Sequence, residues 1–106
     1  MYVQINIGRN VGDTPMTSDR WNEFIQAAAG VLISAKAPGS TAPFMVHRGV
    51  GVWVDDDGER VYEDSSHISI FDEQGLDLDK IRAGLATLRD DFGQDSIALI
   101  VGSELI

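Results

Sequence analysis

The stretch RGVGVWVDDDGERVYED, residues 48–64, constrains the fold most strongly, because it has the form of a β-hairpin. Two glycines alternate with valines, and a tryptophan, three aspartates, a glycine and a charged return strand follow. The Asp57-Gly58 pair is typical of a two-residue type I′ turn, in which both central residues need positive φ. Folding about that turn predicts two cross-strand pairs, Trp53 with Tyr62 and Val54 with Val61.

That register conflicts with the sequence that follows the hairpin. If it continues, Val50, Val52 and Val54 share one face, while Ile68 and Ile70 fall on the other face together with Trp53. A slip of one residue reverses every side chain of a strand. We therefore predict a β-bulge or a strand break near Ser65-Ser66, which would return the apolar residues to one face.

Periodicity locates the remaining elements. Residues 3–7 alternate apolar and polar side chains, which predicts a half-buried strand. A helical stripe follows, which Thr17 caps and Gly30 ends. The stripe consists of Trp21, Phe24, Ile25 and Ala28. Residues 31–43 are ambiguous: VLIS could extend this helix or form a short strand, and APGSTAP reads as a loop.

A second helical stripe and a final strand complete the chain. The stripe lies between a capping Asp77 and a terminating Gly93, and comprises Leu78, Ile81, Leu85, Leu88 and Phe92. Residues 96–106 are apolar on both faces, which is the pattern of a well-covered strand.

The element order is β-α-β-β-α-β, which predicts one α+β domain over residues 1–106. Two right-handed crossovers around a central hairpin give a ferredoxin-like sandwich with both helices on one face of a four-stranded antiparallel sheet. The expected strand order across the sheet is fourth, first, third, second. The opposite face of the sheet, which we call the open face, would remain uncovered.

Composition excludes several classes of function. The formal net charge of −9 disfavours binding to a phosphate backbone, which depends on Lys and Arg. The absence of cysteine rules out thiol catalysis and thiolate metal sites. Because there is no signal-peptide pattern and no apolar run of membrane-spanning length, we expect a cytoplasmic protein that binds no membrane.

Four stretches resemble a family of small bacterial proteins known only as a domain of unknown function, many of them secreted or lipoprotein-like. The stretches are INIGRN, MTSDRWNEF, GVGVWVDDDGERVYEDSS and DDFGQDSIALI. The resemblance implies the ferredoxin-like fold and no activity. The chain departs from the family in having no signal or lipidated cysteine, and its segment before the hairpin is different. More loosely, the chain is similar to small acidic proteins of actinobacterial phages.

The open face provides the candidate binding site. The predicted register gathers two histidines, two aromatic side chains, an amide and a carboxylate on it: Asn6, His47, Trp53, Tyr62, Asp64 and His67. As a catalytic surface, it would use one histidine as a base that Asp64 orients. Without a nucleophile or a metal-ligand spacing, we assign no catalytic residue, metal or cofactor.

Interaction with a protein is the leading functional expectation. We expect a non-enzymatic protein that self-associates as a homodimer through the open face and that, if it is encoded by a phage, modulates a host factor. The expected anchors of that dimer are Met45, Trp53, Tyr62 and Ile100. A small-molecule binder or enzyme built around His47, Asp64 and Trp53 is the alternative. Acidic mimicry of nucleic acid by the carboxylates of residues 55–63 is a third.

Overall fold

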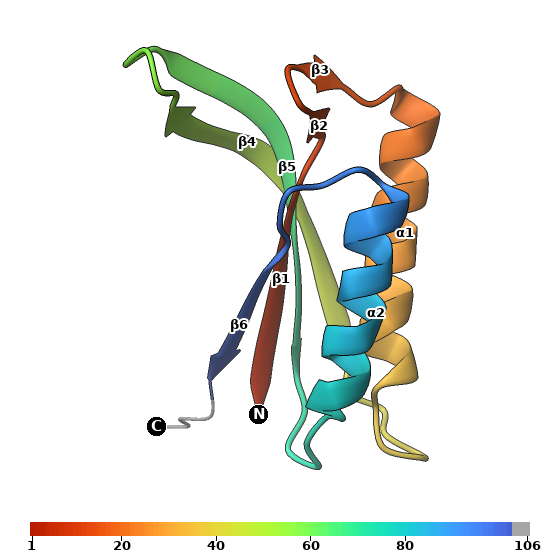
Figure 1. Ribbon diagram of the computed structural model, residues 1–106. Coiled ribbons are helices and arrows are strands. Elements are labelled where there is room, and N and C mark those ends of the chain that lie inside the picture. The colour runs from red at the N-terminus through yellow and green to blue at the C-terminus, as the bar shows by residue number, and fades with distance from the viewer. Residues whose placement is uncertain (103–106) are drawn as a thin grey trace.

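A computed structural model describes residues 1–102 and has the predicted α+β architecture. Two helices cover one face of a four-stranded antiparallel sheet, and the other face is bare (Figure 1). The strand order, β4-β5-β1-β6, is the predicted order. The sheet strands are β1 (Tyr2–Gly8), β4 (Phe44–Val54), β5 (Arg60–Phe71) and β6 (Ala98–Gly102), and the helices are α1 (Ser18–Ser34) and α2 (Leu78–Asp91).

The first helix begins as predicted and ends later than predicted. The Thr17 side chain accepts a hydrogen bond from the Arg20 N–H at 3.2 Å, which caps the helix. Gly30 does not end it, because Leu32 extends the buried stripe by another turn. VLIS is therefore helix. Between β1 and α1 lies a small hairpin of two short strands, β2 (Asn10–Val11) and β3 (Thr14–Pro15).

The second helix has the predicted boundaries. Asp77 caps its N-terminus by accepting from the Lys80 N–H at 3.1 Å, and Gly93, with φ of 65°, follows its C-terminus. The last four residues of the predicted final strand, 103–106, lie outside the described residues. The core fills the space between the helices and the sheet. Its largest fully buried apolar side chains are Val3, Ile5, Phe24, Leu32, Ile68, Ile70 and Ile81.

The hairpin turn differs from the predicted type I′ turn. Among the described residues, only glycines have positive φ, so Asp57 cannot occupy the first central position of a type I′ turn. Instead, the Gly58 N–H donates to the Asp55 carbonyl at 3.0 Å, Gly58 has φ of 79°, and the Asp55 N–H donates to the Glu59 carbonyl at 3.0 Å. These features are those of a hairpin loop that is one residue longer than a type I′ turn and has a glycine in the left-handed region.

The longer loop shifts the register by one residue. Val54 pairs with Arg60, Trp53 with Val61 and Val52 with Tyr62, so both predicted cross-strand pairs are wrong. The shift also removes the conflict that predicted a bulge. The ladder continues without interruption to Phe44 opposite Ile70, and there is no bulge at Ser65-Ser66. The apolar pattern required one additional residue in the hairpin, and that residue lies in the turn and not in a bulge.

Beyond the helices, the β4–β5 hairpin curves away from the body as an arm, residues 50–62 (Figure 1). On the side that faces the helices, apolar side chains of the arm are uncovered: Val50 is 61% exposed, Val54 63% and Tyr62 62%. The arm therefore presents two accessible faces where the rest of the sheet presents one. Within residues 1–102, none of the helices combines the length and hydrophobicity needed to cross a membrane.

Candidate functional site

Three of the six predicted site residues form a row across the open face. His67 on β5 lies opposite Asn6 on β1 and opposite His47 on β4. Both histidines are exposed and Asn6 is half-buried. Along β1, the Tyr2 hydroxyl donates to Gln4 at 2.6 Å, and the Gln4 amide donates to Asn6 at 2.7 Å. The first strand thus carries a chain of hydrogen-bonded polar side chains on this face.

The other three predicted residues do not lie on one surface. Trp53 is on the open face, nearer the tip of the arm, whereas the shifted register turns Tyr62 and Asp64 to the opposite face. There Asp64 pairs with Arg9, with Nη1 and Oδ2 2.9 Å apart. Because Asp64 and His47 project from opposite sides of the sheet, Asp64 cannot orient His47 as a catalytic base. The predicted histidine–aspartate pair is wrong.

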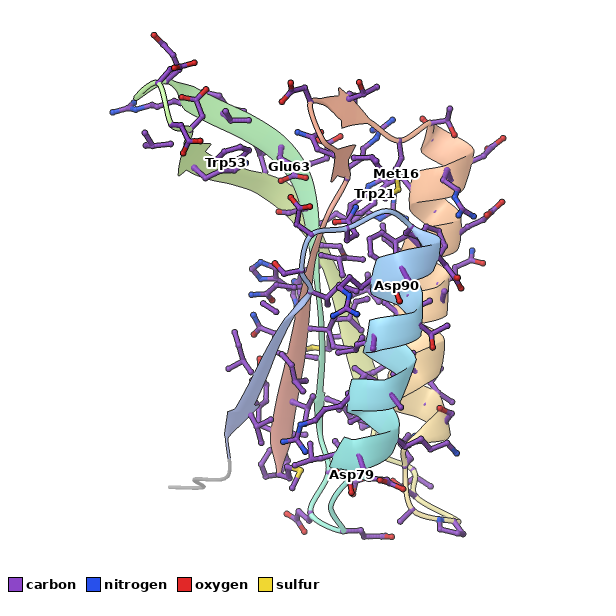
Figure 2. All side chains as sticks on the ribbon, viewed as in Figure 1. Met16, Trp21, Trp53, Glu63, Asp79 and Asp90 are labelled. Carbon is purple, nitrogen blue, oxygen red and sulfur yellow. The ribbon has the colours of Figure 1, made fainter. Side chains whose placement is uncertain are left out.

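A pocket lies where the arm leaves the sheet, and Trp53 forms one of its walls. It has a volume of about 340 Å³, which is within the range of small-molecule sites. Figure 2 shows Trp53 and Glu63 on the part of the hairpin that borders it. We call it the Trp53 pocket, and its lining residues are Gly8, Asn10, Gly12, Asp13, Trp53, Glu63, Gly93, Gln94, Asp95 and Ser96.

Glu63 is the most firmly placed carboxylate of the Trp53 pocket. One of its oxygens, Oε2, accepts a hydrogen bond from the Asn10 N–H at 2.7 Å. The carboxylate lies directly over Gly8, where a Cβ atom would be only 2.5 Å from Oε2 and 2.7 Å from Cδ. Only glycine leaves room for this arrangement, because real Cβ atoms do not approach other atoms so closely. Gly8 therefore permits the close approach of Glu63 to the β1 backbone.

Asn10 joins Glu63 to the opposite wall of the pocket. Its carbonyl accepts a hydrogen bond from the Gln94 side-chain amide at 3.1 Å, while its N–H is bound by Glu63. Arg20 holds the segment before Gln94. Its guanidinium lies 3.9 Å from the centroid of the Phe92 ring and donates to the Asp91 carbonyl at 2.9 Å. The first helix, the β1 loop and the α2–β6 loop thus fix the pocket together.

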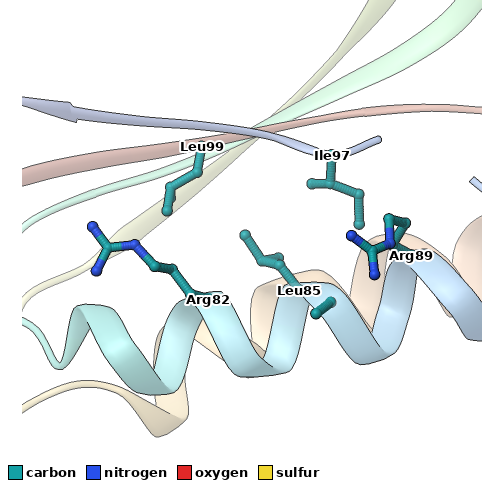
Figure 3. Close-up of a pocket in the computed structure, with 6 residues that line it drawn as sticks. Arg82, Leu85, Arg89, Ile97 and Leu99 are labelled. Atoms are coloured by element: carbon teal, nitrogen blue, oxygen red, sulfur yellow. The ribbon is translucent and has the colours of Figure 1, made fainter. Parts of the chain in front are cut away.

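Two other cavities are less suited to a ligand. The hollow between α2 and β6 is about 160 Å³, and its floor of Leu85, Ile97 and Leu99 is flanked by Arg82 and Arg89 (Figure 3). That volume is below the usual size of a small-molecule site. A hollow of about 430 Å³ beside α1 contains the Arg9–Asp64 ion pair. Arg9 also donates from Nε to the Met16 carbonyl at 2.7 Å, so its hydrogen-bonding groups serve the structure of the loop.

Across the described residues 1–102, no three His, Asp or Glu side chains are grouped closely enough to hold a metal ion. What the Trp53 pocket offers is chemically distinct: an aromatic wall, a fixed carboxylate, two further carboxylates at Asp13 and Asp95, and the backbone of glycine-containing loops. Aromatic faces and carboxylates attract cations, and the combination suits a positively charged organic molecule.

Comparison with solved structures finds similarity to structures of a phage enzyme. The chain is similar to a phage SAM lyase in complex with S-methyl-5′-thioadenosine, with 29% identity over 92% of this chain and 76% of the other, and a TM-score of 0.58. It is similar to a phage SAM lyase in the apo state with 27% identity over 92% and 75%, and a TM-score of 0.53. No protein-family model and no curated protein matches the chain, so the resemblance to the uncharacterised family stays a prediction.

These matches overturn the leading functional expectation. The sequence favoured a non-enzymatic interaction protein, whereas the two similar structures are of an enzyme. That expectation rests on the absence of a nucleophile and of a metal-ligand spacing. A lyase acting on a reactive sulfonium substrate requires neither, so their absence did not argue against an enzyme.

Sequence reasoning missed Glu63 and gave Gln94 no role in a site. Glu63 was considered only among the carboxylates of residues 55–63 that could mimic nucleic acid, and the one-residue register error placed Asp64 on the face that Glu63 occupies. A usable signal was present: INIGRN and DDFGQDSIALI stand out in the sequence through their resemblance, and they supply Gly8, Asn10 and Gln94 to the Trp53 pocket.

Proposed function

We propose that this chain binds S-adenosylmethionine in the Trp53 pocket and cleaves it, with 5′-methylthioadenosine as one product. The observation that carries the proposal is the similarity to a SAM lyase holding S-methyl-5′-thioadenosine over 92% of this chain. A phage origin and action in the cytoplasm, where S-adenosylmethionine is made, are parts of the same proposal.

The pocket has the chemistry that this substrate needs. S-adenosylmethionine combines an adenosine, a sulfonium cation and an amino acid with an ammonium group. Trp53 presents an aromatic face that is 46% exposed and can stack on the adenine or cover the sulfonium. Glu63 presents a carboxylate whose position is set before any ligand binds, because Asn10 holds one oxygen and Gly8 leaves it room.

The charge change during the reaction decides which part of the substrate Glu63 binds. The sulfonium loses its positive charge as the carbon–sulfur bond breaks, so a carboxylate placed against it would stabilise the substrate more than the transition state. Such an interaction strengthens binding without increasing the rate. The α-ammonium keeps its charge throughout. We therefore assign Glu63 to the ammonium group, where it holds the amino acid chain in one orientation.

Orientation is what the reaction requires. The carboxylate oxygen of the substrate attacks its own Cγ and forms a γ-lactone. The carbon–sulfur bond breaks, its electron pair goes to sulfur, and neutral 5′-methylthioadenosine leaves. No water, proton donor or metal is consumed, and the net charge of +1 stays on the lactone's ammonium. Fixing a reactive conformer and excluding water from the sulfonium are sufficient sources of acceleration for such a step.

Paired variants of the hairpin test this assignment. Glu63→Gln removes the carboxylate charge from the pocket, and we expect kcat/KM for cleavage to fall by about 10- to 100-fold. Glu59→Gln makes the same chemical change at the exposed tip of the hairpin and should leave cleavage unchanged. Release of 5′-methylthioadenosine, followed by liquid chromatography, gives the rates. If both variants cleave at the same rate, Glu63 does not bind the substrate.

A further inference from the structure

Arg20 lies in the first turn of α1 and is not among the residues that line the Trp53 pocket. We infer that it is nevertheless a positioning residue for cleavage, because it fixes two walls of that pocket relative to each other. This inference rests on the proposed function. Arg20 acts on the substrate only through the residues that it holds in place.

The pocket opens between two loops that are far apart in the sequence. One loop follows β1 and carries Asn10, and the other carries Gln94 and crosses from α2 to the sheet (Figure 1). The first loop is joined directly to α1, since the Met16 N–H donates to the Arg9 carbonyl at 2.9 Å just before the helix begins. A contact between Arg20 and the second loop therefore determines how far apart the two walls lie.

Arg20 makes that contact in two ways at the end of α2. Its Nη2 donates to the Asp91 carbonyl at 2.9 Å, and its guanidinium lies 3.9 Å from the centroid of the Phe92 ring. The Phe92 ring also stacks on the fully buried Phe24 of α1, with 4.5 Å between the ring centroids. A planar guanidinium can cover a ring and donate hydrogen bonds in its own plane, whereas the compact ammonium of lysine presents no such surface.

The end of α2 determines where Gln94 lies. The Gln94 N–H donates to the Arg89 carbonyl at 2.9 Å, which attaches its backbone to the last turn of the helix. Its side-chain amide donates to the Asn10 carbonyl at 3.1 Å, and the Asn10 N–H donates to the Glu63 carboxylate at 2.7 Å. Contacts thus run from Arg20 to the carboxylate that we assign to the substrate's ammonium. A small displacement of such a group lowers the rate, because the reactive conformer must be held closely.

A second arginine of the chain provides the matched control. Arg20 forms an ion pair with Glu23 one turn along α1, at 3.0 Å, and Arg82 forms the equivalent pair with Asp79 on α2, at 3.4 Å. Arg20→Gln and Arg82→Gln each remove one positive charge and one such pair. Only Arg20→Gln also removes the contact between the two walls of the pocket.

Steady-state kinetics provide the first test. We expect Arg20→Gln to lower kcat/KM for S-adenosylmethionine cleavage by about 3- to 30-fold and Arg82→Gln to leave it unchanged. Arg20→Lys keeps the charge and should recover only part of the loss. Because Arg20 acts through Gln94, the double variant Arg20→Gln, Gln94→Ala should be about as active as Gln94→Ala alone. Thermal unfolding confirms that each variant is folded at the assay temperature.

Amide NMR spectra of the protein without substrate provide the second test, which needs no catalysis. Arg20→Gln should shift the Asn10 backbone signal and the Gln94 side-chain amide signals, and Arg82→Gln should leave them in place. Unshifted signals in Arg20→Gln, full recovery by Arg20→Lys, independent losses in the double variant, or equal activity of Arg20→Gln and Arg82→Gln would each overturn the inference. Failure of the proposed function is a different result, since the unmodified protein itself would then not cleave S-adenosylmethionine.

Discussion

At the scale of single residues, the account depends on a glycine that makes room for a carboxylate. Gly8 leaves the space that Glu63 occupies, and the Asn10 N–H holds the carboxylate there. The atoms that a Cβ would meet belong to the end of a flexible side chain, which can rotate away. The fold would therefore tolerate a larger residue in place of Gly8, but that residue would displace the Glu63 carboxylate.

We predict that Gly8→Ala keeps the protein folded and lowers cleavage of S-adenosylmethionine by about 10- to 100-fold, because it displaces Glu63. Gly49→Ala is the matched control. Gly49 lies in the same cross-strand row, and a Cβ there would have no heavy atom within 4 Å. Thermal unfolding and the cleavage rate should be measured for both variants. Unchanged cleavage by Gly8→Ala would contradict the role given to the Glu63 position.

A second residue-scale prediction concerns Asp72 and acid stability. The Ser40 hydroxyl donates to the Asp72 carboxylate at 2.6 Å, and this bond, followed by that from the Gln74 N–H, holds the Asp72 pKa below its usual value. A carboxyl whose pKa is lower in the folded state stabilises the fold above its unfolded pKa of about 3.9 and loses that contribution as the pH falls through the folded value.

Ser40→Ala removes the largest cause of that lowered pKa. We expect the midpoint of acid unfolding, followed by circular dichroism, to move to higher pH. Ser34→Ala removes an exposed hydroxyl that donates only to the Val31 carbonyl in its own helix, and should leave the midpoint where it was. If the two variants unfold at the same pH, the Ser40–Asp72 hydrogen bond does not stabilise the fold.

At the scale of elements, the turn of the β4–β5 hairpin determines which side chains face the Trp53 pocket. Asp55 organises that turn, because its Oδ1 accepts from the N–H groups of Asp57 and Glu59, both at 2.9 Å. This loop is one residue longer than a type I′ turn at Asp57-Gly58, because Asp56 joins it, and it brings Glu63 to the side of Trp53.

We predict that Asp55→Ala lowers the free energy of unfolding by about 1–2 kcal/mol, since two turn N–H groups lose their acceptor. Asp56→Ala, at the neighbouring exposed position, should cost less than about 0.5 kcal/mol. Urea denaturation monitored by Trp53 and Trp21 fluorescence measures both. Equal stability of the two variants would show that the Asp55 side chain is not what fixes the turn.

The elements also show what could be predicted from sequence. Hydrophobic periodicity was sufficient for the order of strands and helices, and handedness rules then gave the strand order. The turn type was not determined, because Asp-Gly fits two loops that differ by one residue. This error of one residue in the register placed Tyr62 and Asp64 on the wrong face of the sheet and Glu63 on the face away from Trp53. The Trp53 pocket was also hidden because Asn10, Glu63 and Gln94 are far apart in the sequence.

At the scale of the whole molecule, the two faces of the sheet have separate tasks. The helices bury one face and provide stability. The other face holds the Trp53 pocket at its upper edge and an uncharged surface below it. A strongly acidic chain that places Glu63 beside an aromatic wall has a pocket suited to the cationic substrate that we propose for it.

Incubation of the purified protein with S-adenosylmethionine tests the central claim most directly. Liquid chromatography with mass detection should show 5′-methylthioadenosine and the amino-γ-lactone accumulating in equal amounts, faster than in buffer alone. Two results together would contradict the account. S-adenosylmethionine would be lost no faster with the protein than in buffer alone, and calorimetry would detect no binding of S-adenosylmethionine or 5′-methylthioadenosine.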